Sequence, residues 1–486
     1  MTAEARDLAW LAEVTQGVWL GPPSGEAVFR GATTDSRGVT SGMAFVALRG
    51  ERVDGFNYCG PAAAAGASVV IVPGGRGLPK GVGATPVLAV DDPLTALGRL
   101  AEAVRAAFSG RVVAVTGSNG KTTTKELIAA AVSSLGEVLK TPGNYNTDIG
   151  LPLTVLGAQG REKVWVLEMA MRARGEISYL THLARPHVAV VTNVGAAHLG
   201  RLGSLAAIGA AKGEIFEGLT PDGVGLIPAG EPLLMPSVQF LPQARRLRFG
   251  TQVGGAPGLG VALLDFVPAG AAGSVVRYAV GDEPVLVNLP LAGLHNAVNG
   301  GIALLVAAVL GVPPQVAAAG LEQVELPAHR SRPLALADRV VLDDCYNANP
   351  SSMSAAVSTA VAGARGTGRA FALIGDMLEL GEAEVALHEA LGAEAAAAGV
   401  VGLAGVGRLG RHVAAGARRA GLAWTFEGDD PAEAARHVAG WTRPGDWILV
   451  KGSRGARLER AVAALQTLWA DEVIEGGAPD ALGKSL

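Results

Sequence analysis

The sequence predicts an α/β protein of several domains, in which mostly parallel sheets are covered by helices. Short apolar and β-branched runs alternate with stretches of helical spacing along the chain. A chain of 486 residues is too long for one ordinary core, so we expect two to four domains. The alternation restarts near Leu326. We therefore predict an N-terminal domain at 1–105, a central domain at 106–326 and a C-terminal domain at 327–486.

Composition restricts the class of protein. With 40 Lys and Arg against 44 Asp and Glu, the net charge is -4, which argues against a nucleic-acid-binding protein. The longest apolar run, 302–312, is too short to span a bilayer, so no stable membrane insertion is expected. The first residues lack the pattern of a signal peptide. Two cysteines, Cys59 and Cys345, provide no disulfide framework, so a reducing cytoplasm is expected.

The first hundred residues combine two short strands with one polar cluster. Strands are expected at 44–48 and 68–72, with an alanine-rich helix at 61–67 between them. The cluster at 33–37 places hydroxyls, a carboxylate and a guanidinium in one loop. Such a loop suits a nucleotide or a sugar diphosphate, although composition alone favours a solvated surface turn.

The stretch from Val112 to Lys125 predicts a phosphate-binding loop. Val112–Val115 is typical of a buried strand, 116–120 is a turn of small residues, and a helix begins at Lys121. Lys121 would reach the β- and γ-phosphates and the Thr122 hydroxyl would bind Mg²⁺. The first glycine of the general motif is replaced by Ala114, and the alternative is a strand–turn–helix with a chance Gly-Lys pair.

Polar side chains follow the next strands, where a parallel sheet gathers its ligands. A loop rich in Gly, Pro and Asn at 141–152 precedes the strand 164–167, which ends at Glu168. Glu168 is a candidate Mg²⁺ ligand, or alternatively a helix cap. The strand 188–191 leads to His198, which is equally consistent with a ligand and a core histidine. Lys212, in a helix expected at 206–219, is by itself typical of a solvated lysine.

The remainder predicts a β-excursion and a second sheet. Short alternating strands at 228–290 extend the central sheet, and a long helix at 297–310 follows polar residues that suit a nucleotide base edge or backbone. Beyond Leu326, strands are expected at 339–344, 370–374, 400–403 and 447–450. This part has polar groups at its strand ends and no phosphate-binding loop, as a substrate-closing lid domain would.

Taken together, the motifs resemble those of the Mur ligases, the ATP-dependent amide-forming enzymes of peptidoglycan synthesis. The matching segments are TDSR at 34–37, FVALRG at 45–50, TGSNGKT at 116–122, GNYN at 143–146, IGLP at 149–152, EM at 168–169, GEI at 175–177, TNVG at 192–195, AHL at 197–199, AKGEI at 211–215, GLHN at 293–296, DDCYNANP at 343–350, GDMLELG at 375–381 and KGSR at 451–454. The DDCYNANP and GDMLELG blocks favour the type that adds D-alanyl-D-alanine to a UDP-N-acetylmuramoyl tripeptide. Ala170 and Ala196 depart from the pattern, where relatives often carry Gly and Glu.

The resemblance implies the architecture and the reaction. It implies a small α/β UDP-binding domain, a central ATPase domain with a parallel sheet and a phosphate-binding loop, and a C-terminal Rossmann-like α/β domain. It also implies acid–amino-acid ligation through an acyl phosphate, with ATP and Mg²⁺, and release of ADP and phosphate. A cytoplasmic monomer with a place in cell-wall synthesis, cell shape and cell division is expected.

The resemblance also assigns roles to single residues. Catalytic roles fall on Lys121, Lys212 and His198, with Lys212 similar to a family lysine that becomes a carbamate. Metal ligands are Thr122, Glu168, His198 and Lys212. Nucleotide contacts are Gly117, Ser118, Asn119, Gly120, Lys121, Thr122, Thr123, Asn296, Asn299, Arg330 and Asp344. Substrate contacts are Asp35, Ser36, Arg37, Asn144, Asn146, Tyr346 and Asn347. Arg332 is the alternative to Arg330, which is favoured for its spacing to Asp344.

Two other classes of function stay open at this point. A sister ligase, either the type that adds the third residue or a folylpolyglutamate synthase, shares the phosphate-binding loop, although the tyrosine-containing DDCYNANP block argues against both. A P-loop switch would bind ATP and change partners without ligation. Its phosphate release would not depend on an acyl acceptor.

Overall fold

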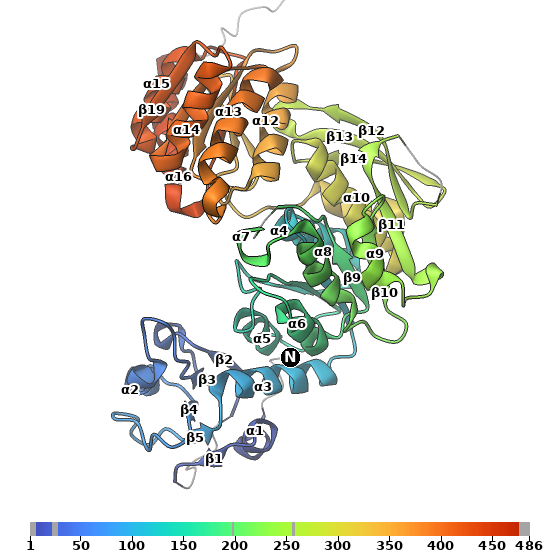
Figure 1. Cartoon of the computed structure of the whole chain (residues 1–486). Coiled ribbons are helices and arrows are strands. Elements are labelled where there is room, and N and C mark those ends of the chain that lie inside the picture. Colours follow the sequence, from blue (N-terminus) through green and yellow to red (C-terminus); the bar gives the residue numbers. More distant parts are fainter. Residues whose placement is uncertain (1–5, 22–27, 197–198, 255–257, 476–486) are drawn as a thin grey trace, which may run out of the picture.

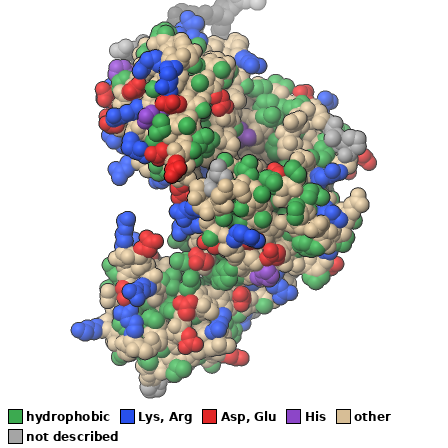
Figure 2. Space-filling view, viewed as in Figure 1, with side chains coloured by type: hydrophobic (Ala, Val, Ile, Leu, Met, Phe, Trp, Pro, Cys, Tyr) green, Lys and Arg blue, Asp and Glu red, His purple; other side chains and the backbone are tan. Residues whose placement is uncertain are grey.

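The computed structural model describes residues 6–21, 28–196, 199–254 and 258–475 and has three domains, each built around its own sheet (Figure 1). The domains follow one another in chain order, with the central domain between the other two. Figure 2 shows charged side chains of both signs spread over one face, which is indented between the N-terminal domain and the rest. Within the described ranges, every helix is too short or too polar to cross a membrane.

The N-terminal domain has a five-stranded sheet in the order β1-β5-β4-β3-β2. Its strands are β1 (Val18–Trp19), β2 (Gly31–Thr33), β3 (Met43–Val46), β4 (Val69–Pro73) and β5 (Val87–Val90), and its helices are α1 (Leu8–Thr15), α2 (Cys59–Ala64) and α3 (Pro93–Ala107). Only β1 pairs antiparallel. The helix expected at 61–67 stops earlier, because Gly66 turns the chain with a φ of 96°.

The central domain has a nine-stranded sheet in the order β14-β13-β12-β11-β10-β9-β6-β8-β7. Its strands are β6 (Arg111–Thr116), β7 (Val138–Lys140), β8 (Val164–Glu168), β9 (Val188–Val191), β10 (Val224–Pro228), β11 (Arg246–Val253), β12 (Val261–Pro268), β13 (Ser274–Val280) and β14 (Glu283–Leu289). Its helices are α4 (Lys121–Ala131), α5 (Gly150–Leu156), α6 (Glu176–Ala184), α7 (Leu199–Leu202), α8 (Leu205–Gly213), α9 (Met235–Val238), α10 (Leu294–Val309) and α11 (Pro314–Glu322). Strands β13 and β14 are antiparallel, so the predicted β-excursion forms the edge of the same sheet.

The strand β6 is the centre of this domain. It lies between β8 and β9 and pairs in parallel with both. Its residues Val112–Val115 have no exposed surface, as their apolar side chains require on a strand covered on both faces. Strand order reverses beside β6, and ligands of open α/β sheets bind at such a point.

The helix predicted at 206–219 is shorter in the structure. It ends at Gly213 and is followed by a 3₁₀ turn at Glu214–Phe216. A Cβ on Gly213 would lie 2.0 Å from Ser237 Oγ, so α8 packs closely at its end. The Glu214 carboxylate then accepts a hydrogen bond from the backbone of Gly175, at the start of α6.

The C-terminal domain has a six-stranded sheet in the order β15-β16-β20-β17-β18-β19. Its strands are β15 (Arg332–Leu336), β16 (Arg339–Asp343), β17 (Ala370–Gly375), β18 (Val400–Val406), β19 (Trp424–Gly428) and β20 (Trp447–Lys451), and its helices are α12 (Pro350–Ala364), α13 (Glu384–Ala398), α14 (Gly407–Arg419), α15 (Pro431–Trp441) and α16 (Glu459–Glu475). The four expected strands are present within a few residues of their predicted bounds. Only the edge strand β15 is antiparallel to its neighbour.

Candidate active site

The turn between β6 and α4 forms an anion-binding loop at the centre of the sheet. Gly117 and Gly120 have φ values of 151° and 78°, which favour glycine. A Cβ on Gly117 would lie 1.8 Å from Thr192 Oγ1. Gly120 begins α4 without a side-chain cap, so the first amide N–H groups of the helix are left for a ligand. The loop therefore has the backbone that a phosphate requires.

The Lys121 amine folds back over this loop. Its Nζ donates to the Gly117 carbonyl at 2.7 Å. Burial lowers the pKa of Lys121. The Glu168 carboxylate opposes this shift, and the Arg330 cation adds to it. Arg330 lines the same cavity as Lys121, whereas Arg332 is exposed at the start of β15. The role of Arg330 in preference to Arg332 stays a prediction.

Thr122 and Glu168 lie together below the loop. The Thr122 hydroxyl donates to Glu168 Oε2 at 2.8 Å, and Asn146 Nδ2 donates to Oε1 at 2.7 Å. Glu168 is the last residue of β8 and is buried, so the alternative of a helix-capping glutamate is wrong. Hydroxyl and carboxylate oxygens are the ligands that Mg²⁺ prefers.

Lys125 completes this group, and our sequence analysis missed it. It is 1% exposed, donates to the Thr141 carbonyl at 2.6 Å, and lies 3.0 Å from Glu126 and 4.0 Å from Glu168. Its place one helical turn after Lys121 was the available signal, because both side chains then share one face of α4.

Lys212 is buried in α8, and the alternative of a solvated lysine is wrong. It is 2% exposed. Burial lowers its pKa well below the usual value, and the Lys121 cation lowers it further. Burial therefore favours the neutral amine of Lys212 more than it would for an exposed lysine. His198 lies outside the described residues.

Residues of the C-terminal domain complete the site from the other side. Asp344 Oδ2 lies 2.5 Å from Lys451 Nζ, and Oδ1 accepts from the Ser331 backbone at 2.9 Å. The Arg330 guanidinium stacks over the Tyr346 ring at 3.8 Å. Lys451 is buried at the end of β20. The sequence analysis included it in the KGSR motif but did not predict it as a site residue, although its position at the end of a strand indicated one.

The phosphate-binding loop contacts the C-terminal domain directly. Asn349 Nδ2 donates to Asn119 Oδ1 at 2.6 Å, and Asn119 Nδ2 donates to Ser351 Oγ at 2.8 Å. Asn349 also caps α12, where it accepts from the Ser352 backbone. One residue of the loop is thus bonded to the start of a helix in another domain.

A cavity of about 570 Å³ joins these groups. Its lining includes these predicted site residues: Ser118, Asn119, Gly120, Lys121, Thr122, Thr123, Asn144, Asn146, Glu168, Asn296, Asn299, Arg330, Asp344, Tyr346 and Asn347. Gly117 belongs to the loop but does not line the cavity. Lys212 does not line it either, although the Lys121 cation lowers its pKa.

The predicted cluster Asp35–Arg37 lies apart from this cavity. It is in the N-terminal domain, after β2, and lines neither this cavity nor the next one. The Arg37 side chain donates twice to Asp35, at 2.9 and 2.7 Å. These side-chain hydrogen bonds, together with one from the Arg37 backbone N–H, lower the pKa of Asp35 to about 2.

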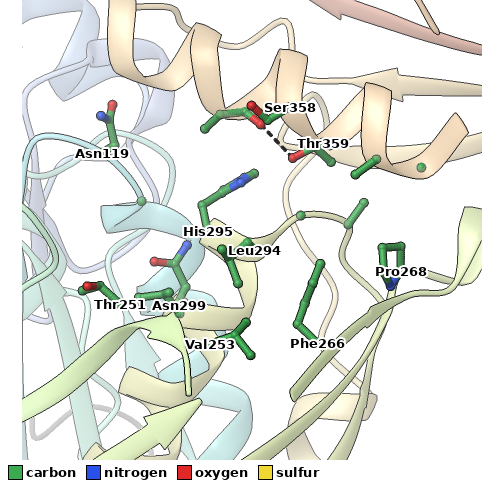
Figure 3. Close-up of a pocket in the computed structure, with 18 of the residues that line it drawn as sticks. Asn119, Thr251, Val253, Phe266, Pro268, Leu294, His295, Asn299, Ser358 and Thr359 are labelled. Atoms are coloured by element: carbon green, nitrogen blue, oxygen red, sulfur yellow. Dashed lines mark hydrogen bonds between the residues drawn. The ribbon is translucent and has the colours of Figure 1, made fainter. Parts of the chain in front are cut away.

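A second, more apolar cavity of about 580 Å³ adjoins the first (Figure 3). The two share Asn119, Gly120, Asn193, His295, Asn299 and Ala355. Figure 3 shows His295 between α10 and α12, with apolar side chains of the central sheet on the opposite side. Burial lowers the pKa of His295. The Asp344 carboxylate opposes this shift, and the Lys451 cation adds to it. A neutral polar ring beside apolar walls suits a flat heterocycle next to the phosphate site.

Comparisons with known proteins agree over most of the chain. The family model "Mur ligase middle domain" matches residues 115–307, "Mur ligase, glutamate ligase domain" matches 329–454 and "Mur ligase family, catalytic domain" matches 28–105. The UDP-N-acetylmuramoyl-tripeptide–D-alanyl-D-alanine ligase of Bacillus subtilis is 35% identical over 460 residues, which cover 94% of this chain and 97% of the relative.

Two solved structures have the same three-domain fold. MurF from Acinetobacter baumannii superposes with a TM-score of 0.85 at 30% identity and covers 96% of this chain and 100% of its own. MurF ligase from Thermotoga maritima, in complex with ADP, superposes with a TM-score of 0.79 at 28% identity and covers 91% and 98%. The predicted fold class is thereby confirmed.

Proposed function

This chain belongs to the Mur ligase family, and we infer that it is the ATP-dependent ligase that joins D-alanyl-D-alanine to a UDP-N-acetylmuramoyl tripeptide. It forms a C–N bond in peptidoglycan precursor synthesis and releases ADP and phosphate. The observation that carries the inference is the cavity of about 570 Å³, where a phosphate-binding loop faces the charged residues of a second domain. The acyl-phosphate route, the metal and the residue roles below are our proposals.

The loop supplies what phosphoryl transfer requires from a protein, namely position and charge compensation. A carboxylate is a poor acyl donor, and transfer of the γ-phosphoryl group to it makes an acyl phosphate, which the amine of D-alanyl-D-alanine can attack. The free N–H groups at the start of α4 would hold the phosphates. Lys121 would exchange the Gly117 carbonyl, 2.7 Å away, for a phosphate oxygen.

Thr122 and Glu168 fit a Mg²⁺ ion. Their oxygens are 2.8 Å apart, both residues are buried, and both are hard ligands. Bound Mg²⁺ would neutralise charge on the transferring phosphoryl group. Asn146 would keep the Glu168 carboxylate in one orientation through its 2.7 Å hydrogen bond.

Lys212 fits a carbamate. Carbamate formation needs the neutral amine, which burial and the nearby Lys121 favour. The nitrogen attacks CO₂, one proton leaves, and the side chain then ends in an anionic oxygen pair instead of a cation. Such a group would serve as a further metal ligand in the family-like site.

The other domains would hold the remaining parts of the substrates. Arg330 and Asp344, which line the first cavity with Asn296, would contact the nucleotide, and the second cavity would take the adenine beside Asn299. Asp35–Arg37 would serve the UDP end. The cytoplasmic location and the monomeric state remain predictions.

The test of this function is a coupled assay. We expect ADP release from ATP with the UDP-N-acetylmuramoyl tripeptide only when D-alanyl-D-alanine is present, with tripeptides carrying diaminopimelate, lysine or ornithine compared side by side. Use of the dipeptide substrate with a free third amino acid would instead identify a sister ligase. Phosphate release that is independent of every acceptor would indicate a nucleotide switch.

A further inference from the structure

Three metal-ligand side chains meet behind the loop that lines the active-site cavity. His329 Nδ1, an Asp343 oxygen and Cys345 Sγ all lie within 4.8 Å of one another. His329 Nδ1 is 2.8 Å from Asp343 Oδ2, and the Cys345 thiol donates to Asp343 Oδ1 at 3.1 Å. The reaction proposed above uses none of the three.

The backbone explains why these residues converge. Side chains alternate in direction along an extended chain, so Asp343 and Cys345 share one side and Asp344 the other. Asp344 and Tyr346 line the cavity, whereas Asp343 and Cys345 do not and are 4% and 1% exposed. The group therefore lies on the reverse side of the segment that carries two cavity residues.

His329 reaches the group from the linker between α11 and β15. It adopts a φ of 66°, a backbone region unusual for histidine. Its carbonyl accepts from the Tyr346 backbone N–H at 3.1 Å, which ties the linker to the end of β16. The His329 side chain is 28% exposed, so the group is open to solvent on this side.

We propose that His329, Asp343 and Cys345 form a binding site for Zn²⁺ or a cation of similar chemistry. Imidazole nitrogen, carboxylate oxygen and thiolate sulfur are the ligand types that zinc selects. Bond lengths of about 2.0–2.3 Å place tetrahedral ligand atoms about 3.3–3.8 Å apart. His329 and Cys345 bond different oxygens of Asp343, and the three ligand atoms, one from each residue, lie within 4.8 Å of one another, so they need to shift by only about 1 Å to reach this spacing. Water would take the fourth position.

Binding replaces the internal hydrogen bonds of the group. The Cys345 S–H bond breaks, its proton passes to solvent, and the thiolate and the neutral imidazole bind the cation. The cation then fixes the linker to the segment that bears Asp344 and Tyr346. We expect ligation to slow as a result, and this consequence alone rests on the proposed function. Excess Mg²⁺ would not compete, because it prefers oxygen ligands.

The test titrates Co²⁺ into the full-length protein after chelator treatment and records the thiolate-to-cobalt charge-transfer absorption. Wild type and Cys59→Ser, which removes the other cysteine, should both develop the band at one equivalent and lose it when Zn²⁺ is added. Cys345→Ser, whose hydroxyl can still donate to Asp343, should show no band. His329→Gln should weaken Co²⁺ binding by about tenfold or more.

Activity provides a second readout in the same variants. Zn²⁺ in the presence of excess Mg²⁺ should inhibit wild type and Cys59→Ser at about tenfold lower concentration than Cys345→Ser. A wild-type protein without the charge-transfer band would overturn the proposal even if Cys345→Ser fails to fold. A band that persists in folded Cys345→Ser would overturn it as well. A Co²⁺ site with normal activity would overturn only the inhibition, which separates this result from a failure of the proposed function.

Discussion

Replacing Lys212 with alanine should remove most of the ligase activity, and formate should restore part of it. In our account the side chain acts as a carbamate, so the variant loses an anionic ligand and not a positive charge. A small carboxylate can occupy the vacated position. Lys212→Arg keeps a cation that does not lose its proton, and it should be as inactive as Lys212→Ala.

The magnitude follows from burial. An exposed lysine with a pKa of about 10.4 needs about 4.6 kcal/mol to lose its proton at pH 7. Lys212 is 2% exposed and its pKa is well below the usual value, so this cost is smaller in the folded protein. Losing one preorganised charge-stabilising group typically reduces turnover by about 10²–10³-fold, and we expect a loss of this size.

The assay measures ADP release for wild type, Lys212→Ala and Lys212→Arg, each with and without formate. An arginine variant of nearly full activity, or an alanine variant that formate does not help, would contradict the carbamate role.

The stability of the fold gives a readout that is independent of turnover. A depressed folded-state pKa means that the stability due to the neutral amine is complete above about pH 10.4 and is lost as the pH falls below it. Lys212→Met should therefore raise the unfolding temperature at pH 7 and change it little near pH 10.4.

Three further predictions concern the rest of the site. Lys121→Ala should abolish turnover and leave the fold intact by circular dichroism, because it removes the point charge at the transferring phosphoryl group; near wild-type ADP release would refute the phosphate-loop assignment. The double variant Ser36→Ala and Arg37→Ala should raise the KM for the UDP-peptide and leave that for ATP nearly unchanged, so equal losses for both would argue against a separate UDP site. Lys125→Met should lower the free energy of unfolding by about 3 kcal/mol in urea titration, because it leaves the buried Glu126 carboxylate with one cation fewer; a loss below about 1 kcal/mol would contradict a structural role for the pair.

The sequence predicted the strands of the fold better than its helix ends. The apolar runs at β6 and β8 are buried on both faces, so their composition alone is informative. The end of α8 depends on the approach of Ser237 to Gly213, a contact between residues far apart in the sequence. Local periodicity carries no record of such a contact.

The site was predictable where chemistry follows a strand end or a glycine turn. Glu168 and Lys121 met that condition. Lys125 did not, because it lies one helical turn further along α4. Its spacing to Lys121 indicates a shared helix face, but a lysine in a helix is usually exposed, and the fold is needed to show that this one is only 1% exposed. The hydrogen bonds of Asn119 to the C-terminal domain could not be predicted either, because its partner Asn349 is 230 residues away in the sequence.

The most direct measurement of the central claim follows an oxygen atom. The UDP-N-acetylmuramoyl tripeptide is labelled with oxygen-18 in its terminal carboxylate and incubated with ATP and D-alanyl-D-alanine. If the carboxylate is activated as an acyl phosphate, attack by the amine leaves one labelled oxygen in each inorganic phosphate released. Our account predicts one labelled phosphate for each amide bond formed. Amide formation with unlabelled phosphate would contradict it.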